Sequence, residues 1–314
     1  MKYATIDMGT NTIRLLIARL RRHCVFDFLV QKSMIARIGE GFGHRRLITE
    51  AALQRTRKVL SEYKHLIDIH GVKDVFVAAT SAIREAENGD WFVDSLSDFG
   101  FHIEIISPER EAYLTHLGIL YFQSDKLDSK RWLAFDLGGG STEFIFSEGR
   151  KLIFTTSLPL GGVKLLERHV KHDPPLPEEI ENLTLEFREA LEKELPHFDP
   201  ELIVGNAGTV TSLAAIDQGL TRYSHSATEG YCLKKERIER IARQMSQMSA
   251  DDRLNRYKVL EKGREDVIVV GAYVVLTILE AFGAQYLITT NGSLREGLLI
   301  ERVCDGRKQK ESLS

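Results

Sequence analysis

The chain has 314 residues, of which 43% are hydrophobic and 28% are charged, and its formal net charge is −3 at pH 7. These values exclude a single small module, a disordered chain and a fibrous protein, and they indicate one large or two ordinary globular domains. A net charge so close to zero supplies no overall positive field, so we expect no binding of duplex nucleic acid.

Cysteine usage and the absence of a targeting pattern indicate where the protein works. Cys24, Cys232 and Cys304 lie far apart, are odd in number and match no metal-binding spacing, which favours a reducing compartment. The N-terminal residues enter a strand pattern without the features of a signal peptide. The most apolar segment, residues 267–282, is shorter than the roughly 20 residues that span a bilayer. We therefore expect a cytoplasmic protein with a buried helix there and no membrane partner.

Strand and helix patterns alternate along the first part of the chain. Strands are expected at residues 3–9, 12–20, 74–80 and 101–107, and helices at residues 49–71 and 109–123. The first helix is the clearest, because apolar residues from Ala52 to Leu60 recur at helical spacing behind Thr49, a residue type suited to cap a helix. Strand and helix in succession predict an α/β fold with a largely parallel core.

A polar stretch at residues 123–131 separates this part from residues 132–142, where a strand pattern starts again. It is the best candidate for a domain boundary. A second break at residues 171–179 is rich in proline and leads into an amphipathic helix at residues 180–195. Proline at such a place is typical of the start of a helix and indicates a structural role.

An internal echo is the most informative feature of the sequence. The segments IDMGTNTIRLLI, residues 6–17, and FDLGGGSTEFIF, residues 135–146, share the order apolar, Asp, apolar, Gly, three small or polar residues, a small or apolar residue, a charge and an apolar run. Asp7 and Asp136 are 136 − 7 = 129 residues apart. The pairing predicts two halves of similar build that face one another across a cleft.

The second copy of the echo has the composition of a phosphate and metal site. Gly138, Gly139 and Gly140 lack Cβ atoms, so their backbone N–H groups can approach an anion closely. Carboxylates at Asp136 and Glu143 repel phosphate, so their presence beside such a loop makes sense through a divalent cation. The alternative is a tight turn between two solvated acids.

Two further turns offer donors to phosphate. The first copy of the echo supplies Gly9, Thr10, Asn11 and Thr12, with Asp7 where the second copy has Asp136, although a turn that satisfies its own backbone remains the alternative. The segment IVGNAGTVTSLAA, residues 203–215, predicts a strand, a glycine turn and a helix whose N-terminus carries Thr209. Such a helix start is an anion site in many α/β proteins, and by itself it is a weak signal.

Two charged residues of the first half follow predicted strands. Arg84 comes after a strand and a small-residue turn, and arginine offers planar paired donors to phosphate. Its alternative is a surface ion pair with Glu85 or Glu87. Glu111 lies in the first turn of a predicted helix, where a carboxylate can simply favour the helix dipole.

Taken together, these motifs resemble the exopolyphosphatase and guanosine pentaphosphate phosphohydrolase family, in its short two-domain form. The resemblance runs through IDMGTNTIRLLIA, AATSAIREA, ISPEREAYLT, FDLGGGSTE, LPLGGVKLLE, IVGNAGTVTSLAA, REDVIVVGA and NGSLREGLL, in that order. It implies a duplicated, actin-like α/β fold of the ribonuclease H-like kind with the active site in the cleft between two domains. The implied domains are residues 1–124, with residues 298–314 packing back on them, and residues 125–297. Longer members add a C-terminal helical domain, for which this sequence has no counterpart.

The resemblance also implies an activity and a set of site residues. The activity is hydrolysis of the terminal phosphoanhydride of polyphosphate or pppGpp with Mg²⁺ or another divalent cation, and relatives are often homodimers. Glu111 is expected to activate water, Arg84 to contact phosphate, and Asp136 and Glu143 to serve at the metal and catalytic centre, with Asp7 as a further candidate ligand. The phosphate-binding residues are expected to be Gly9, Thr10, Asn11, Thr12, Gly138, Gly139, Gly140, Ser141, Thr142, Gly205, Asn206, Gly208 and Thr209.

The sequence departs from the family pattern at two motifs. Pro108 and Arg110 replace a glycine and a glutamate before Glu111, and Asn291 and Ser293 replace an aspartate and a glycine near the end. Two other functions therefore stay open, namely an ATP-dependent kinase of the same fold and a sensor that binds (p)ppGpp or polyphosphate without hydrolysing it. The choice between polyphosphate and pppGpp also stays open, as does whether Glu143 chiefly holds the metal or shares the water with Glu111.

Overall fold

The computed structural model describes residues 1–22, 24–42 and 45–305. The chain forms two compact units, one made of residues 1–121 with the segment that begins at Gly292, and one made of residues 122–291. The chain leaves the first unit inside helix α4 (Pro108–Leu127), so the polar stretch expected to be a boundary begins as helix. Of the C-terminal segment expected to pack on the first domain, residues 298–305 belong to the first unit and residues 306–314 lie outside the described residues.

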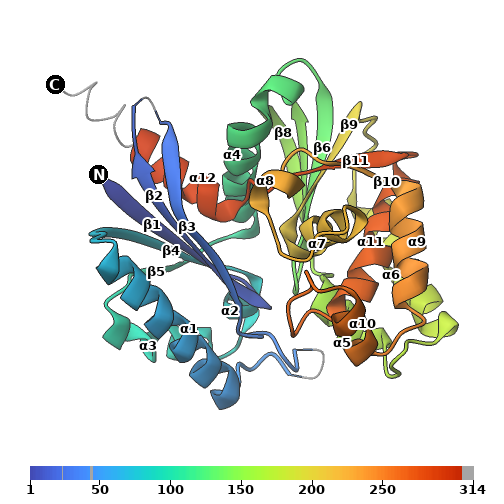
Figure 1. Cartoon of the computed structure of the whole chain (residues 1–314), viewed down its shortest axis with the longest axis horizontal. Helices are drawn as coiled ribbons and strands as arrows, with labels where there is room; N and C mark the ends of the chain where they lie inside the picture. The colour runs from blue at the N-terminus through green and yellow to red at the C-terminus, as the bar shows by residue number, and fades with distance from the viewer. Residues whose placement is uncertain (23, 43–44, 306–314) are drawn as a thin grey trace. The chain divides into compact units, whose positions relative to one another are not determined.

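The first unit is built on a five-stranded mixed sheet (Figure 1). Its strands are β1 (Lys2–Met8), β2 (Thr12–Leu20), β3 (Phe26–Ile35), β4 (Asp74–Ala79) and β5 (Ile103–Ile105), in the order β3-β2-β1-β4-β5. β1, β2 and β3 pair antiparallel, whereas β1, β4 and β5 pair parallel. The short β1–β2 and β2–β3 connections cannot make the crossover that parallel strands need, which is why the sheet is mixed and not largely parallel.

Helices cover both faces of this sheet. The other elements of the unit are α1 (Glu50–Ile69), α2 (Ser81–Glu85), α3 (Gly89–Asp94), η1 (Ser97–Phe99), α4, α12 (Leu294–Ile300) and the π-turn η2 (Glu301–Asp305). Thr49 caps α1 as predicted, because its hydroxyl accepts a hydrogen bond from the Ala52 N–H at 3.2 Å. Alternate residues of β1 point to opposite faces, so Ile6 packs in the core that includes α1 while Tyr3 packs against α12 and η2.

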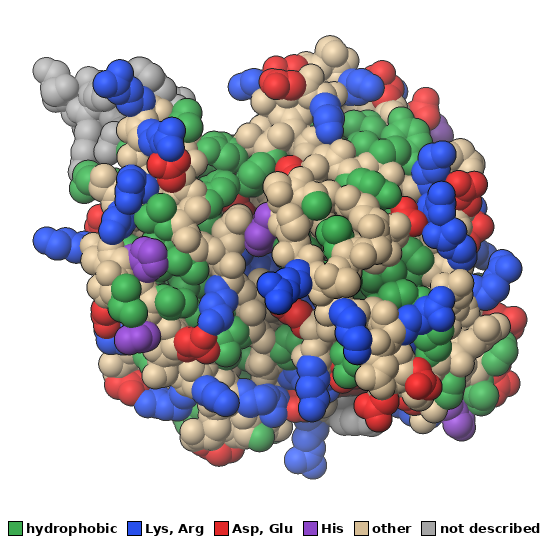
Figure 2. All heavy atoms as spheres, viewed as in Figure 1, with side chains coloured by type: hydrophobic (Ala, Val, Ile, Leu, Met, Phe, Trp, Pro, Cys, Tyr) green, Lys and Arg blue, Asp and Glu red, His purple; other side chains and the backbone are tan. Residues whose placement is uncertain are grey.

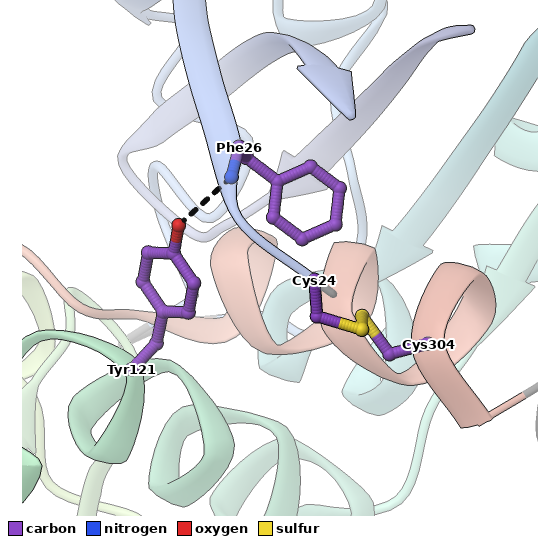
Figure 3. Close-up of a disulfide and its surroundings, with 4 residues drawn as sticks. All are labelled: Cys24, Phe26, Tyr121 and Cys304. Atoms are coloured by element: carbon purple, nitrogen blue, oxygen red, sulfur yellow. Dashed lines mark hydrogen bonds between the residues drawn. A yellow bond between two sulfur atoms is a disulfide. The ribbon is translucent and has the colours of Figure 1, made fainter. Parts of the chain in front are cut away.

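Backbone contacts and a disulfide fasten the C-terminal elements to this unit. A Cβ at Gly297 would lie 1.7 Å from the Leu114 carbonyl oxygen, so α12 and α4 approach as closely as glycine allows. Figure 3 shows the bond between Cys24, after β2, and Cys304 in η2, beside the Phe26 N–H that donates to the Tyr121 hydroxyl at 3.1 Å. No local pattern in the sequence predicts this pairing, because the two cysteines are 280 positions apart.

The second unit repeats the strand order of the first. Its sheet has the order β10-β11-β9-β6-β7-β8 and consists of β6 (Arg131–Leu137), β7 (Thr142–Glu148), β8 (Lys151–Leu158), β9 (Leu202–Asn206), β10 (Cys232–Lys234) and β11 (Tyr286–Thr289). β8-β7-β6-β9-β11 matches β3-β2-β1-β4-β5 in order and in strand direction. The predicted duplicated, actin-like α/β fold is confirmed.

Seven helices complete the described part of the second unit, and most of them pack on one face of its sheet (Figure 1). They are α5 (Gly162–His169), α6 (Pro177–Glu194), α7 (Ala207–Asp217), α8 (His225–Thr228), α9 (Lys235–Met245), α10 (Ala250–Arg256) and α11 (Val267–Ala281). The apolar segment predicted to be a buried helix is α11, which is buried along most of its length. Among the described residues, no helix combines the length and apolarity that crossing a bilayer requires.

Candidate active site

The two echo segments fold into equivalent hairpin loops. In the first unit, β1 and β2 place Asp7 opposite Arg14, and the Gly9 N–H donates to the Thr12 carbonyl at 3.1 Å. In the second unit, β6 and β7 place Asp136 opposite Glu143, and the Gly138 N–H donates to the Ser141 carbonyl at 3.0 Å. A Cβ at either glycine would lie 3.0 Å from the same carbonyl oxygen, which explains why both copies begin the turn with glycine.

The carbonyl groups of both loops are bound by the chain that follows the third strand. In the first unit, Gly39 N–H donates to the Thr10 carbonyl at 3.0 Å, and the Ala36 and Arg37 N–H groups donate to the Asn11 carbonyl. In the second unit, Gly162 N–H donates to the Gly138 carbonyl and Val163 N–H to the Gly139 carbonyl, both at 2.9 Å. The carbonyl dipoles of the loops are therefore engaged within each unit.

Apart from Gly9 and Gly138, whose N–H groups close the turns, the same loops carry N–H groups that make no hydrogen bond in the described part of the chain. Within residues 1–22, 24–42 and 45–305, no hydrogen-bond acceptor is found for the backbone N–H of Thr10, Asn11, Gly139 or Gly140. A loop is suited to bind an anion when its carbonyl groups already accept hydrogen bonds and some of its N–H groups have no acceptor within the protein. This pattern favours the phosphate-loop interpretation of both segments over a turn that satisfies its own backbone.

The side chains of the predicted phosphate-binding residues differ in what they contact. The Thr10 hydroxyl lies 2.9 Å from the Ser81 hydroxyl, at the start of α2. Asn11 Oδ1 is buried without a hydrogen-bond partner among the described residues. The Thr142 hydroxyl donates to the Leu160 carbonyl at 2.7 Å. Thr142 thus supports the loop, whereas Thr10 and Asn11 retain polar atoms that a ligand can use.

The third predicted turn is sharper than expected. β9 ends at Asn206 and α7 begins at Ala207, whose φ of 78° is in the left-handed region that residues with a Cβ disfavour by about 1–3 kcal/mol. Asn206 Nδ2 donates to Asp136 Oδ2 at 3.0 Å, which joins this turn to the acidic pair. Thr209 lies in the first turn of α7, as predicted, and Gly205 is buried among Val210 and other apolar side chains, so it serves packing.

Arg264 is a residue of this region that the sequence analysis missed. A Cβ added to Gly208 would lie 1.7 Å from Arg264 Nη1, so the guanidinium lies directly over the glycine at the start of α7. Arg264 Nε donates to Glu261 Oε2 at 3.0 Å, and the side chain is only 14% exposed. The only local signal is the RED triplet before α11, which does not indicate a contact with Gly208.

Asp136 and Glu143 form the acidic part of the second unit. They are directly opposite one another on adjacent strands, which places their side chains on the same face with Cβ atoms roughly 5 Å apart. Glu143 is 2% exposed, and its Oε1 accepts a hydrogen bond from the Ser157 hydroxyl at 2.9 Å. Asp7, by contrast, faces Arg14 across its hairpin, so the acidic pair is a feature of the second copy alone.

The acidic pair has the donor chemistry of a magnesium site. In the described part of the chain, no group of three or more His, Cys, Asp or Glu side chains is close enough to hold a metal ion. Mg²⁺ does not need such a cage, because it usually binds one or two carboxylates and takes its remaining ligands from water and substrate phosphates. Asp136 and Glu143 therefore fit Mg²⁺ better than a softer metal held entirely by protein.

Arg84 and Glu111 meet in the first unit. Arg84 Nη1 lies 3.1 Å from Glu111 Oε2 and also donates to the Ile106 carbonyl at 2.8 Å. The two side chains are 19% and 13% exposed. The alternative of a surface pair between Arg84 and Glu85 or Glu87 is therefore wrong. Glu111 lies in the first turn of α4, as predicted, and its partner comes from α2.

The departures from the family pattern have structural explanations. Pro108 is the first residue of α4, a position that does not need its missing N–H. Arg110 forms an ion pair with Glu301 through both of its Nη atoms, and the hydrogen bonds of this pair raise the pKa of the Arg110 guanidinium. Ser293 caps α12 with Glu296, and Asn291 accepts from Tyr223 and donates to the His225 carbonyl.

The chain is similar to proteins of one family over nearly its whole length. Residues 16–305 match the Ppx/GppA phosphatase family. The chain is 31% identical to "Exopolyphosphatase 2" of Mycobacterium tuberculosis, over 95% of this chain and 98% of that protein. It is 28% identical to a "Bifunctional 3-dehydroquinate synthase/phosphatase" of Fusobacterium nucleatum, and 27% identical to a "Guanosine-5'-triphosphate,3'-diphosphate pyrophosphatase" of Vibrio cholerae. Those matches cover 96% and 98% of this chain, but only 46% and 60% of the respective relatives.

A solved structure shows the same fold over the full length. The Ppx/GppA family member of Aquifex aeolicus superposes with a TM-score of 0.81 and 31% identity, over 98% of both chains. Fold and sequence similarity thus place the chain among phosphatases of duplicated α/β architecture. The chain belongs to the Ppx/GppA phosphatase family.

Proposed function

We propose that the protein is a metal-dependent phosphoanhydride hydrolase that releases orthophosphate from the end of polyphosphate or pppGpp. The observation that carries this proposal is that both hairpin loops have N–H groups without acceptors among the described residues. The same two units supply a carboxylate held by an arginine, Glu111 with Arg84, and a carboxylate pair, Asp136 with Glu143. The names of the relatives from M. tuberculosis and V. cholerae support the two substrate classes without choosing between them.

In this proposal, the loops bind and orient the phosphates. The N–H groups of Thr10, Asn11, Gly139 and Gly140 donate to phosphate oxygens, and the start of α7 adds further donors with Thr209. Arg264, which lies over Gly208, adds positive charge at that helix start. Fixed donors of this kind favour the developing charge of the transition state because they need no reorganisation.

Glu111 is the group proposed to act on water. Its carboxylate orients a water molecule and accepts its proton as the oxygen attacks the terminal phosphorus. The bond to the bridging oxygen breaks in line with the attack, so the shortened phosphate chain or ppGpp leaves and the attacked group is released as orthophosphate. Arg84, 3.1 Å from Glu111 Oε2, holds the carboxylate in place and donates to the equatorial oxygens of the transferred group. Mg²⁺, or another divalent cation, would be held by Asp136 and Glu143 and would neutralise charge on the phosphate chain.

Phosphate-release kinetics test the proposal directly. Purified protein is incubated with Mg²⁺ and long-chain polyphosphate, tripolyphosphate, pppGpp or ATP, and orthophosphate is measured over time, with EDTA as control. We expect metal-dependent release from at least one of the first three. Release of ADP from ATP only with an added acceptor would instead identify a kinase. Tight (p)ppGpp or polyphosphate binding without any release would identify a sensor, and either result would refute the proposal.

A further inference from the structure

The loop after β3 carries two adjacent exposed arginines that the proposed chemistry does not use. Arg45 and Arg46 line an open hollow of about 530 Å³ together with Leu47 and Glu87. Among the described residues, neither arginine side chain is paired with a carboxylate. Figure 2 shows Lys and Arg side chains, in blue, along the lower edge of the visible face, where Figure 1 has the start of α1 and the loop before it.

This loop is anchored at one end to the phosphate loop of the first unit. Gly39 N–H donates to the Thr10 carbonyl at 3.0 Å, and a Cβ at Gly39 would lie 2.4 Å from Thr10 Cγ2. Arg45 follows Gly39 by six residues, which span at most roughly 20 Å when fully extended. The arginine pair therefore lies within the reach of a chain of several phosphates that starts at the loop.

The other end of the loop is anchored beside the element that carries Arg84. Glu87 N–H donates to the Arg46 carbonyl at 2.8 Å, and Asn88 exchanges two hydrogen bonds of 2.9 Å with the backbone of Ile48. Both anchors hold backbone groups, so the arginine side chains stay available to a ligand. The loop thus presents positive charge between the Thr10 loop and the segment that follows α2.

We infer that Arg45 and Arg46 form a subsite for the phosphates of a long polyphosphate beyond the terminal one, so that polyphosphate is the preferred substrate class. This inference rests on the proposed function. Two guanidinium groups suit a flexible chain of repeated negative charge, because each can donate to successive phosphates. Leu47 is the single apolar side chain of the hollow, and no aromatic ring lines it, so it offers no stacking platform for the bases of a single-stranded nucleic acid.

The chain contains a matched control and an opposing variant. Arg21 and Arg22 form a second exposed pair, at the far end of β2 from the phosphate loop, where Arg21 pairs with Asp27 at 2.7 Å. The double variant Arg21→Ala/Arg22→Ala removes the same charge as Arg45→Ala/Arg46→Ala. Glu87 is the carboxylate of the hollow, so Glu87→Gln should tighten binding of long-chain polyphosphate.

The experiment measures binding of long-chain polyphosphate in EDTA, and kcat/KM on long-chain polyphosphate and tripolyphosphate with Mg²⁺. Arg45→Ala/Arg46→Ala should weaken binding of the long chain about tenfold, equivalent to about 1.4 kcal/mol. Its loss of kcat/KM should be about tenfold greater on the long chain than on tripolyphosphate. The dependence of log Kd on log salt should become shallower by roughly 0.7 per lost contact, as for single-stranded polyanions. The Arg21/Arg22 control should match wild type.

The outcomes separate this inference from the proposed function. Equal losses on both substrates, or an equal loss in the Arg21/Arg22 control, would overturn the subsite while leaving hydrolysis intact. Arg45- and Arg46-dependent binding of polyphosphate by a protein that releases no phosphate would support the subsite and refute the proposed function. Single-stranded RNA that binds as tightly as polyphosphate, with the same dependence on both arginines, would overturn the choice of polyphosphate.

Discussion

Arg84 Nη1 lies 3.1 Å from Glu111 Oε2, and this ion pair joins α2 to the first turn of α4 in a place where both side chains are mostly shielded from water. The same guanidinium donates to the Ile106 carbonyl, at the end of the segment that precedes α4. Arg84 is therefore fixed by two contacts and retains further N–H groups for a ligand. This geometry is the basis for our proposal that Glu111 acts on water and that Arg84 contacts phosphate.

Replacing Arg84 should lower catalysis more than stability. For Arg84→Ala we expect kcat/KM to fall by about 100- to 1,000-fold, the effect typical of losing one donor to a transition-state oxyanion. Arg84→Lys should recover only part of this loss, because an ammonium group lacks the planar paired donors. Arg57→Ala, which removes a half-buried arginine paired with Asp98, is the control and should retain activity. Wild-type kcat/KM in Arg84→Ala would contradict the assignment.

The acidic pair of the second unit should set the metal requirement. For Glu143→Gln we expect the Mg²⁺ concentration at half-maximal activity to rise at least tenfold, because a carboxamide is a weaker ligand for a hard cation. Titration of Mn²⁺ followed by electron paramagnetic resonance gives a readout that does not depend on turnover. Glu148→Gln changes an exposed glutamate at the end of the same strand and serves as control. Unchanged Mn²⁺ affinity in Glu143→Gln and Asp136→Asn would exclude the pair as metal ligands.

Two neighbouring glycines should respond differently to a methyl group. A Cβ at Gly161 would lie 2.5 Å from the Gly139 carbonyl group, whereas a Cβ at Gly162 would lie 2.8 Å from the Val267 Cγ1 methyl. The Val267 side chain can move to make room for a new methyl group, but the Gly139 backbone cannot move without displacing the phosphate loop. Gly161→Ala should therefore displace this loop. We expect more than a tenfold loss of kcat/KM for Gly161→Ala and a smaller loss for Gly162→Ala. Equal losses in phosphate-release assays would show that the close approach to Gly139 is unimportant.

His116 should make the stability of the protein depend on pH. It is 3% exposed, and burial lowers the pKa of its imidazole from 6.5 to about 4. Because the folded-state pKa is the lower one, the unfolded chain binds more protons between pH 6.5 and pH 4, and the free energy of unfolding falls as the pH drops through that window. The difference between the two pKa values corresponds to about 3 kcal/mol in the free energy of unfolding.

Urea unfolding of wild type and His116→Gln between pH 8 and pH 4 measures this contribution. The variant should lose stability at pH 8, because it alters a packed helix, but its further loss on acidification should be about 3 kcal/mol smaller than that of wild type. Parallel pH profiles for the two proteins would show that His116 does not titrate in the folded state as described.

Local patterns in the sequence predicted the elements that depend on local rules. The echo of Asp7 and Gly9 with Asp136 and Gly138 predicted two equivalent hairpins. Each turn requires glycine because a Cβ there would crowd a carbonyl oxygen of the same turn, so the signal is local. The N-cap at Thr49 and the buried helix α11 follow from periodicity and residue type in the same way. The resemblance to a known family supplied the roles of Glu111 and Arg84, which no local rule gives.

Contacts between distant segments could not be predicted in this way. The bond between Cys24 and Cys304 and the place of Arg264 over Gly208 depend on how whole elements pack. Periodicity also could not tell whether Arg84 turns towards Glu87 or towards Glu111, since both lie within reach of a long side chain. The chain crosses between its units within α4, which ends at Leu127 and so continues into the polar residues 123–131 that were predicted to separate the domains.

Glu111→Gln tests the central claim most directly, with Glu109→Gln as its control in the same turn of α4. Glu109 is exposed, so neutralising it preserves the helix start and changes the local charge by the same amount. Orthophosphate release should fall by about 100- to 10,000-fold in kcat for Glu111→Gln, with little change in KM or metal dependence, and should stay near wild type for Glu109→Gln. Wild-type turnover in Glu111→Gln would contradict the account.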